Sequence, residues 1–147
     1  MLILLPVALA APMHGFVTGG VGLPELVHVE GGWVATPRLD VGLRADLTLF
    51  SPCVGVQVDG LLLGQATDRP PKHALLLSAD LMVNPTNHPF TLATHGESLG
   101  GYVGTYAGYA YTAPSGFLFR VYGGALFTDE GGLSGGPNAA ISVGWGG

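Results

Sequence analysis

The sequence predicts an all-β fold: an eight-stranded, antiparallel, up-and-down transmembrane β-barrel. Three observations lead to this prediction. Segments that alternate polar and apolar residues recur along the chain. Of the 147 residues, 48% are hydrophobic and only 10% are charged. Beyond the N-terminus, no apolar run approaches the roughly 20 residues of a membrane-spanning helix. A hydrophobic chain built from alternating segments is typical of a barrel in lipid.

The first stretch, MLILLPVALAAP, predicts a secretory signal peptide over residues 1–10. Residues 2–9 form a short apolar core, and the sequence ALA precedes Ala11 as a small-residue cleavage site. The segment does not alternate, which favours a signal over the alternative of an additional apolar strand or plug. Export would deliver residues 14–147, the expected barrel domain, to the periplasm or the outer membrane.

Eight alternating segments follow, and residues 38–50 show the pattern most clearly. There Leu, Val and Ala alternate with Arg, Asp, Gly and Thr, a period of two that indicates a strand with two different faces. The expected strands cover residues 14–22, 25–36, 38–50, 53–64, 73–84, 99–111, 116–128 and 138–145. The turn signals between them are, in order, GLPE, TPR, FSPC, GQATDRPPK, PTNHPFTLATHGES, TAPSG and DEGGLSGGP.

Six of the eight expected segments have a clear apolar face. The two exceptions are the first, which is short, and the sixth, which is rich in Tyr and Gly. The other apolar faces consist of Val27, Val29, Trp33 and Ala35; Leu39, Val41, Leu43, Ala45, Leu47 and Leu49; Val54, Val56, Val58 and Leu62; Leu75, Leu77, Ala79, Leu81 and Val83; Phe117, Phe119, Val121, Ala125 and Phe127; and Ala139, Ile141, Val143 and Trp145. Several segments exceed the about five or six residues of soluble strands and suit the roughly 9–11 tilted residues of a membrane strand.

The polar sides carry few charges of mixed sign, separated by glycines. A soluble barrel would show many Lys and Glu on its outward faces, whereas a narrow interior explains both features. Glycine leaves room for large neighbours such as Tyr102 and Tyr106, and buried carboxylates need positive partners. We therefore predict that the polar faces point inward and fill the lumen without an open channel. The expected lumenal polar network consists of His28, Glu30, Arg38, Asp40, Arg44, Asp46, Gln57, Asp59, Asp80, Arg120 and Tyr122.

Aromatic residues lie near the ends of the expected strands. On an outward face they would form girdles at the membrane interfaces, with ordinary core packing as the alternative. These residues are Trp33, Tyr109, Tyr111, Phe117, Phe127 and Trp145.

In strand number, dyad alternation, interior charges and signal-like start, the chain resembles the small eight-stranded outer-membrane barrels of the OmpA/OmpX type over Gly15 to Trp145. The resemblance implies a monomer in the outer membrane of a Gram-negative-type bacterium, with outer-membrane lipid as its partner. It also implies periplasmic termini, and loops 85–98 and 129–137 outside the cell, available to an extracellular partner. The long GQATDRPPK turn and the ending GWGG, with Trp145 third from last, depart from the class pattern.

We expect a structural or surface-interaction role rather than an enzyme. The runner-up is a lipid A deacylase-like enzyme, for which the loop sequence HGES offers His95, Glu97 and Ser98. A metal site that combines His88 with His95 and Glu97 matches no strong ligand spacing. No cofactor is expected.

A soluble lipocalin-like carrier is the second alternative, because GGW at residues 31–33 matches a short lipocalin motif. Such a carrier needs an apolar interior and a charged exterior.

The net charge of −5 and the lack of a basic run make nucleic acid an unsuitable partner. Cys53 is the only cysteine, and we expect it to be a small apolar filler near a turn.

Overall fold

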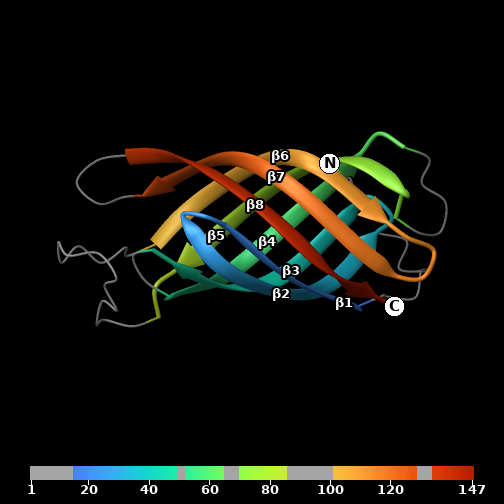
Figure 1. The fold of residues 1–147 in the computed structure, drawn as a ribbon, viewed down its shortest axis with the longest axis horizontal. Coiled ribbons are helices and arrows are strands. Elements are labelled where there is room, and N and C mark those ends of the chain that lie inside the picture. The colour runs from blue at the N-terminus through green and yellow to red at the C-terminus, as the bar shows by residue number, and fades with distance from the viewer. Residues whose placement is uncertain (1–14, 50–51, 65–69, 86–100, 129–133) are drawn as a thin grey trace, which may run out of the picture.

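The computed structural model describes residues 15–49, 52–64, 70–85, 101–128 and 134–147. Within these residues, eight antiparallel strands form a closed barrel in which each strand pairs with its sequence neighbours and β8 pairs with β1 (Figure 1). The strands are β1 (Gly15–Leu23), β2 (Glu25–Thr36), β3 (Leu39–Thr48), β4 (Pro52–Leu62), β5 (His73–Val83), β6 (Gly101–Thr112), β7 (Phe117–Thr128) and β8 (Ser134–Gly146). The predicted all-β, up-and-down architecture with eight strands is confirmed. No helix among the described residues is long and apolar enough to cross a membrane.

The barrel has two unlike rims. The terminal rim holds the start of β1, the end of β8, the connections 37–38 and 113–116, and the strand ends Leu62 and His73. The loop rim holds Pro24 and the strand ends Thr48, Pro52, Val83, Gly101, Thr128 and Ser134. Figure 1 shows the strands running obliquely between these rims. The predicted signal peptide and most of the predicted loop 85–98 lie outside the described residues.

The largest difference from the predicted boundaries is at β8, which begins at Ser134 rather than 138. The predicted loop 129–137 was therefore too long, because residues 134–137 continue the strand and pair with the end of β7. On the other side, β1 pairs with β8 only as far as Ala139. Pro137 thus lies on a β8 extension with a single neighbouring strand, where its missing N–H does not break a two-sided ladder.

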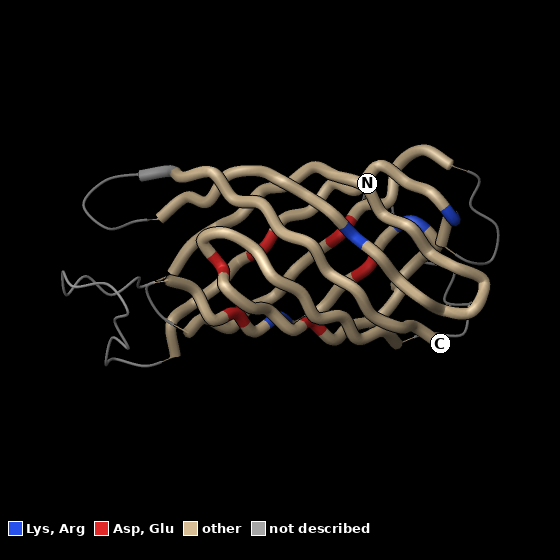
Figure 2. Tube along the Cα trace, in the orientation of Figure 1, with Lys and Arg blue, Asp and Glu red and all other residues tan. Residues whose placement is uncertain are grey.

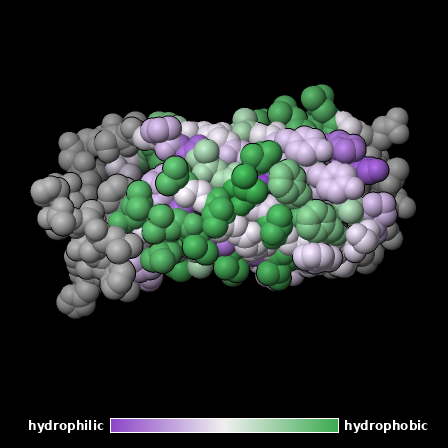
Figure 3. Space-filling view, in the orientation of Figure 1, coloured by the Kyte–Doolittle hydropathy of each residue, from purple (hydrophilic) through white to green (hydrophobic). Residues whose placement is uncertain are grey.

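Apart from the register shifts near the two ends of β2, side chains alternate between the two surfaces of the sheet. In β3 the apolar Leu43 is 60% exposed, whereas the adjacent Arg44 is 2% exposed. The same inversion recurs in β5, where Leu77 is exposed and Asp80 is buried. Space-filling colours show apolar residues over the middle of the barrel's outer surface (Figure 3). The polar side therefore faces the interior, as the alternation predicts.

The interior is filled rather than hollow in the described part of the barrel. Besides the charged residues, a buried cluster contains Leu76, Met82 and the three tyrosines at 102, 106 and 122. Cys53 is buried in the same cluster, in keeping with its predicted role as an apolar filler. The lumen therefore contains both charged and apolar side chains. The three tyrosines belong to the apolar cluster, and their hydroxyl groups contact charged residues.

Inward-facing glycines make this filling possible. A Cβ atom on Gly42 would lie 2.6 Å from Oε1 of Glu30, and one on Gly108 would lie 2.7 Å from Cβ of Tyr122. Real Cβ atoms do not come this close to other heavy atoms. The predicted role of glycine, to leave room for large inward neighbours, is confirmed at Gly42. At Gly108 the added Cβ would also meet the backbone oxygen of Val121, so that glycine allows the close approach of β7 as well.

Candidate functional site

The polar network inside the barrel is the candidate functional site. Ten of its eleven predicted members are each at most 4% exposed and arise from β2, β3, β4, β5 and β7. All six acidic residues of the described part lie in this interior. In Figure 2 the acidic residues are spread over the middle of the barrel. Alternation explains this arrangement, because residues two apart on one strand share a face.

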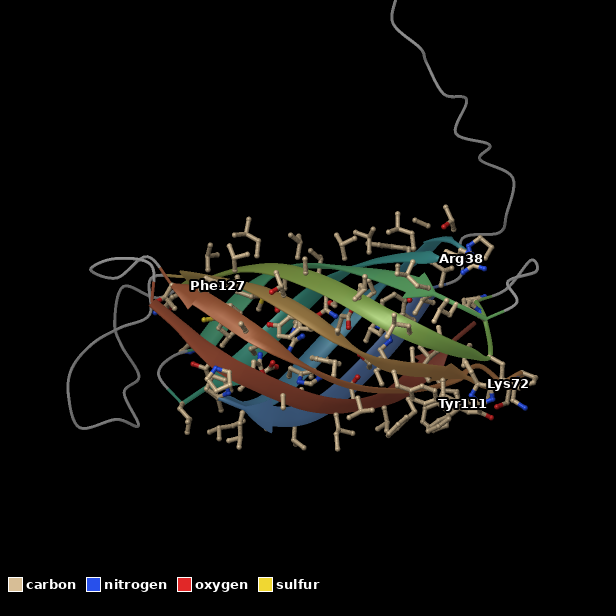
Figure 4. All side chains as sticks on the ribbon, turned by 90° about the horizontal axis from the view of Figure 1, so that it is seen from above. Arg38, Lys72, Tyr111 and Phe127 are labelled. Atoms are coloured by element: carbon tan, nitrogen blue, oxygen red, sulfur yellow. The ribbon has the colours of Figure 1, made fainter. Side chains whose placement is uncertain are left out.

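Arg38 is the exception, and its prediction as a lumenal residue is wrong. It lies in the two-residue connection before β3, is exposed, and donates hydrogen bonds to the backbone oxygens of Leu61, at 3.2 Å, and Gly64, at 3.0 Å. Figure 4 shows Arg38 at the same rim as Lys72. The period of two places Arg38 on the inward side only if the strand extends to it, and the strand begins at Leu39.

One half of the network surrounds Arg44 and is called the Arg44 cluster. Its guanidinium donates to Oδ1 of Asp46 at 2.7 Å and to Glu25, and it lies 3.9 Å from Oδ2 of Asp80. These side chains are at most 1% exposed. One cation is therefore shared by three buried carboxylates, which keeps none of them fully uncompensated.

Neutral donors complete the Arg44 cluster. The Tyr102 hydroxyl donates to Asp46, the Tyr106 hydroxyl donates to Oδ2 of Asp80 at 2.7 Å, and Nδ2 of Asn138 donates to Oε1 of Glu25 at 2.8 Å. Five of the six carboxylate oxygens are thus hydrogen-bonded; the exception is Oδ1 of Asp80. Nδ1 of His28 also lies 3.1 Å from Oε2 of Glu25.

The other half surrounds Arg120 and is called the Arg120 cluster. Its guanidinium donates to Oδ2 of Asp40 at 2.7 Å and to Asp59, and reaches Oε2 of Glu30 only at 3.5 Å. The Thr18 hydroxyl donates to the same Glu30 oxygen at 3.4 Å. The Arg120 guanidinium carbon also lies 5.0 Å from the centre of the Phe16 ring, within cation–π range.

The Arg120 cluster is less completely paired than the Arg44 cluster. Oδ1 of Asp40 and Oε1 of Glu30 are both buried without a hydrogen-bond partner in the described part of the chain. The two contacts to the other Glu30 oxygen are long for hydrogen bonds. A buried carboxylate with an unpaired oxygen favours a positive or donating partner.

Gln57 connects the two clusters. Its side-chain oxygen accepts a hydrogen bond from Nη1 of Arg44 at 2.6 Å, and its nitrogen donates to Oδ1 of Asp59 at 2.8 Å. The Tyr122 hydroxyl accepts a second bond from Nη1 of Arg44 at 3.0 Å. The predicted residues therefore form one connected network across the barrel, apart from Arg38 and from His28, whose ring nitrogens have no hydrogen-bond partner in the described part of the chain.

Sequence reasoning missed several members, and Glu25 shows why. Strict alternation places Glu25 on the side of Val27 and Val29, which face outward. The register between β2 and β3 shifts between Glu25 and Val27, so Glu25 and His28 both point inward although they are three residues apart. Such a bulge reverses the parity of the residues on one side of it. Tyr102, Tyr106 and Asn138 follow ordinary alternation. The sequence placed the two tyrosines in the interior, but none of the three was predicted to belong to the polar network.

The residues predicted for the alternative activities are not among these. His88, His95, Glu97 and Ser98 lie outside the described residues. Within the described part, no group of three His, Cys, Asp or Glu side chains is arranged to hold a metal ion. The lipocalin-like alternative conflicts with the interior, which buries six carboxylates and two arginines where a carrier needs an apolar cavity.

Comparisons of the chain with known protein families, curated proteins and solved structures found no match.

Aromatic side chains on the outer surface gather at the terminal rim. Trp33, Tyr109 and Trp145 are between 39% and 62% exposed. The Phe117 ring packs edge-on against Trp145 at 5.2 Å, and Nδ1 of His73 lies 2.6 Å from the Tyr109 hydroxyl oxygen. Figure 4 shows Tyr111 at this rim and Phe127 at the loop rim. Five of the six aromatic residues predicted to form girdles thus lie at one rim.

Proposed function

We propose that this chain is an integral β-barrel of the outer-membrane type, and that it acts as a rigid, plugged scaffold with a structural or surface-interaction role. The observation that carries the proposal is the inverted polarity of the barrel. Arg44 and Asp80 are buried at 2–3% exposure, while Leu43, Leu77 and Ile141 are 44–60% exposed. Water would disfavour such an outer surface, whereas hydrocarbon tails would not.

Closure of the barrel supports the same proposal. Backbone N–H and C=O groups in a bilayer have no water to bond, so a sheet in lipid must have no open edge. The pairing of β8 with β1 through eight residue pairs removes that edge. The strands contain 9 to 13 residues, and tilted strands of about 9–11 residues cross a bilayer.

The filled interior supports a scaffold rather than a channel. The guanidinium of Arg44 on β3 reaches Tyr122 on β7, and Arg120 on β7 reaches Asp40 on β3, so two side-chain bridges cross the lumen. Barrels of eight strands have interiors that side chains can fill. A scaffold of this kind would hold loops in place at the membrane surface.

The one-sided aromatic girdle gives the proposed orientation. Trp and Tyr favour the headgroup region of a bilayer, and Arg38 and Lys72 lie at the same rim, where their charges would meet lipid phosphates. We place the terminal rim at the periplasmic interface and the loop rim outside the cell. Residues 85–98 and 129–133 would then be available to an extracellular partner.

Quenching of tryptophan fluorescence by brominated lipids tests membrane insertion. The chain has two tryptophans, Trp33 and Trp145, and both lie on the outer surface at the terminal rim. In vesicles we expect strong quenching by bromines close to the headgroups and weaker quenching by bromines at the bilayer centre. Trp33→Phe and Trp145→Phe variants assign the signal to each position. Absence of quenching by every brominated lipid would contradict insertion.

Epitope insertion tests the orientation. A tag placed within residues 86–98 is expected to bind antibody on intact cells. The matched control is a tag within residues 65–69, between the ends of β4 and β5 that lie at the opposite rim, which should be labelled only after the outer membrane is permeabilised. Labelling of the control tag on intact cells, with the other tag protected, would reverse the proposed orientation.

We propose a non-catalytic role for the loop residues His95, Glu97 and Ser98. Incubation of the purified barrel with lipopolysaccharide should release no acyl chains detectable by mass spectrometry. Release that disappears in Ser98→Ala and His95→Ala variants would instead establish the lipid A deacylase-like activity.

A further inference from the structure

A pocket of about 240 Å³ opens at the terminal rim, next to the Arg120 cluster. Phe16 of β1, Val34 of β2 and Leu118 of β7 provide its apolar wall. Thr112 and Ser115 border it, and Asp40 is the only acidic residue in its lining. The pocket therefore combines an apolar wall with a single carboxylate.

The Asp40 carboxylate is incompletely paired. Oδ2 accepts a hydrogen bond from Arg120 at 2.7 Å, while Oδ1 is buried with no hydrogen-bond partner in the described part of the chain. The residue as a whole is 3% exposed. Arg120 is already shared with Asp59 and Glu30, so its single charge does not balance the three carboxylates around it. A further cation at Asp40 would reduce this imbalance.

We propose that the pocket binds a primary alkylammonium group, with the ammonium against the Asp40 carboxylate and the alkyl chain against Phe16 and Leu118. An ammonium has three donors, which suits one carboxylate together with hydroxyl and backbone oxygens at the rim. A bare metal ion is commonly held by several carboxylates or other strong ligands, and no group of three His, Cys, Asp or Glu side chains in the described part of the chain is placed to hold one. The apolar wall adds a hydrophobic contribution that a bare ion cannot obtain. The proposal does not depend on whether the outer surface meets lipid.

The test uses the full chain, folded in a non-ionic detergent, and n-butylammonium as the probe. Amide chemical shifts of Gly116, Leu118 and Gly146, which line the pocket, are followed during titration. We expect saturable shifts confined to the terminal rim. Butan-1-ol, which has the same alkyl chain without the charge, should bind about tenfold or more weaker, as expected for loss of a charge-assisted hydrogen bond. Potassium ions should not produce the same shifts.

Two variants assign the binding to the site. Asp40→Asn should weaken n-butylammonium binding about tenfold or more, because it removes the charge and preserves the shape. The matched control is Asp80→Asn, which removes the same charge from the Arg44 cluster and should leave the affinity within about twofold. Gly146→Leu tests the pocket with Asp40 intact. A Cβ atom at Gly146 would lie 3.3 Å from Cβ of Phe16, so the added side chain should fill the pocket and abolish binding.

Several results would overturn the proposal. These are equal binding of butanol and n-butylammonium, potassium shifts of equal affinity at the same amides, or equal loss of affinity in the Asp40 and Asp80 variants. If Asp40→Asn does not fold, the Gly146→Leu variant decides. An unchanged affinity of this variant for n-butylammonium would also overturn the proposal.

Discussion

The two arginine clusters have the same charges but differ in how those charges are paired. Arg44 and Arg120 are each surrounded by three buried carboxylates. Around Arg44, two tyrosine hydroxyls and an asparagine amide occupy carboxylate oxygens that the cation leaves free. Around Arg120, two carboxylate oxygens have no partner in the described chain, and the cluster adjoins the pocket at the terminal rim.

This difference shows how a small barrel can bury an excess of negative charge in two ways. In the Arg44 cluster, neutral donors and the guanidinium satisfy every carboxylate oxygen except Oδ1 of Asp80, so its stability depends on those bonds being made. The Arg120 cluster has two unpaired carboxylate oxygens and borders the pocket at Asp40, where the proposed alkylammonium would supply a partner. We therefore expect the Arg44 cluster to contribute mainly to stability and the Arg120 cluster to be the responsive part of the interior.

Removal of the arginine should lower the stability of the barrel most in the Arg44 cluster. Arg44→Met leaves three carboxylates without their cation and is expected to lower the free energy of unfolding by about 3–5 kcal/mol. Urea unfolding in lipid vesicles, followed by tryptophan fluorescence, measures this change. Arg44→Lys keeps the charge but loses the multidentate fork, so its effect should be smaller. An Arg44→Ala barrel with unchanged gel migration and melting temperature would contradict the role given to this cluster.

Removal of the arginine from the Arg120 cluster should lower the free energy of unfolding by a smaller amount. Arg120→Met is expected to lower the free energy of unfolding by about 1–3 kcal/mol, because one of its three carboxylates, Asp40, lines a pocket at the rim from which water could replace part of the lost pairing. The same urea experiment at low and high salt provides the comparison. Added salt should restore part of the lost free energy of unfolding in Arg120→Met and little of it in Arg44→Met. Equal losses with equal salt dependence would remove the distinction between the clusters.

Hydroxyl deletions compare the neutral donors of the two clusters. Tyr102→Phe removes the donor to Asp46 and should cost about 1–3 kcal/mol, since it leaves a buried carboxylate oxygen unpaired. Thr18→Val removes a donor whose oxygen lies 3.4 Å from Glu30, and should cost less than about 1 kcal/mol. Unfolding free energies of both variants, measured under one condition, test the order. A larger loss for Thr18→Val would show that the Glu30 contact is stronger than its length indicates.

The smallest expected effect concerns the connection between the clusters. In a double-mutant cycle, Arg44→Lys and Asp59→Asn should be coupled by about 0.5 kcal/mol, because Gln57 hydrogen-bonds to both residues. Repeating the cycle in a Gln57→Leu background should abolish the coupling. Coupling that survives this substitution would mean that the two clusters interact without Gln57.

Alternation along the chain was enough to predict the barrel, the inward polar faces and ten network members. It failed where the backbone departs from a regular strand. Glu25 was missed because a bulge reverses its side, Arg38 was misplaced because it precedes its strand, and residues 134–137 were taken for a loop because Gly and Pro rarely occur in paired strands.

The division of the network into two clusters could not be predicted from the chain alone. Alternation says that Arg44 and Asp46 share a face, but not that Tyr102, 56 residues away, donates to Asp46. Such partners depend on the stagger of non-adjacent strands across the lumen, which no local pattern specifies. The pocket beside Asp40 likewise depends on residues from β1, β2, β3, β6, β7 and β8 that come together at one rim.

The most direct test of the inverted barrel is the accessibility of spin labels on its outer surface in lipid vesicles. Single cysteines at Leu43, Leu77 and Ile141, in a Cys53→Ala background, place labels on three separate strands. For a barrel whose apolar surface faces lipid, we expect frequent collisions with oxygen, which concentrates in hydrocarbon, and few with a water-soluble nickel complex at all three positions. Frequent collisions with the nickel complex at these positions would contradict this arrangement, because the apolar faces would then meet water.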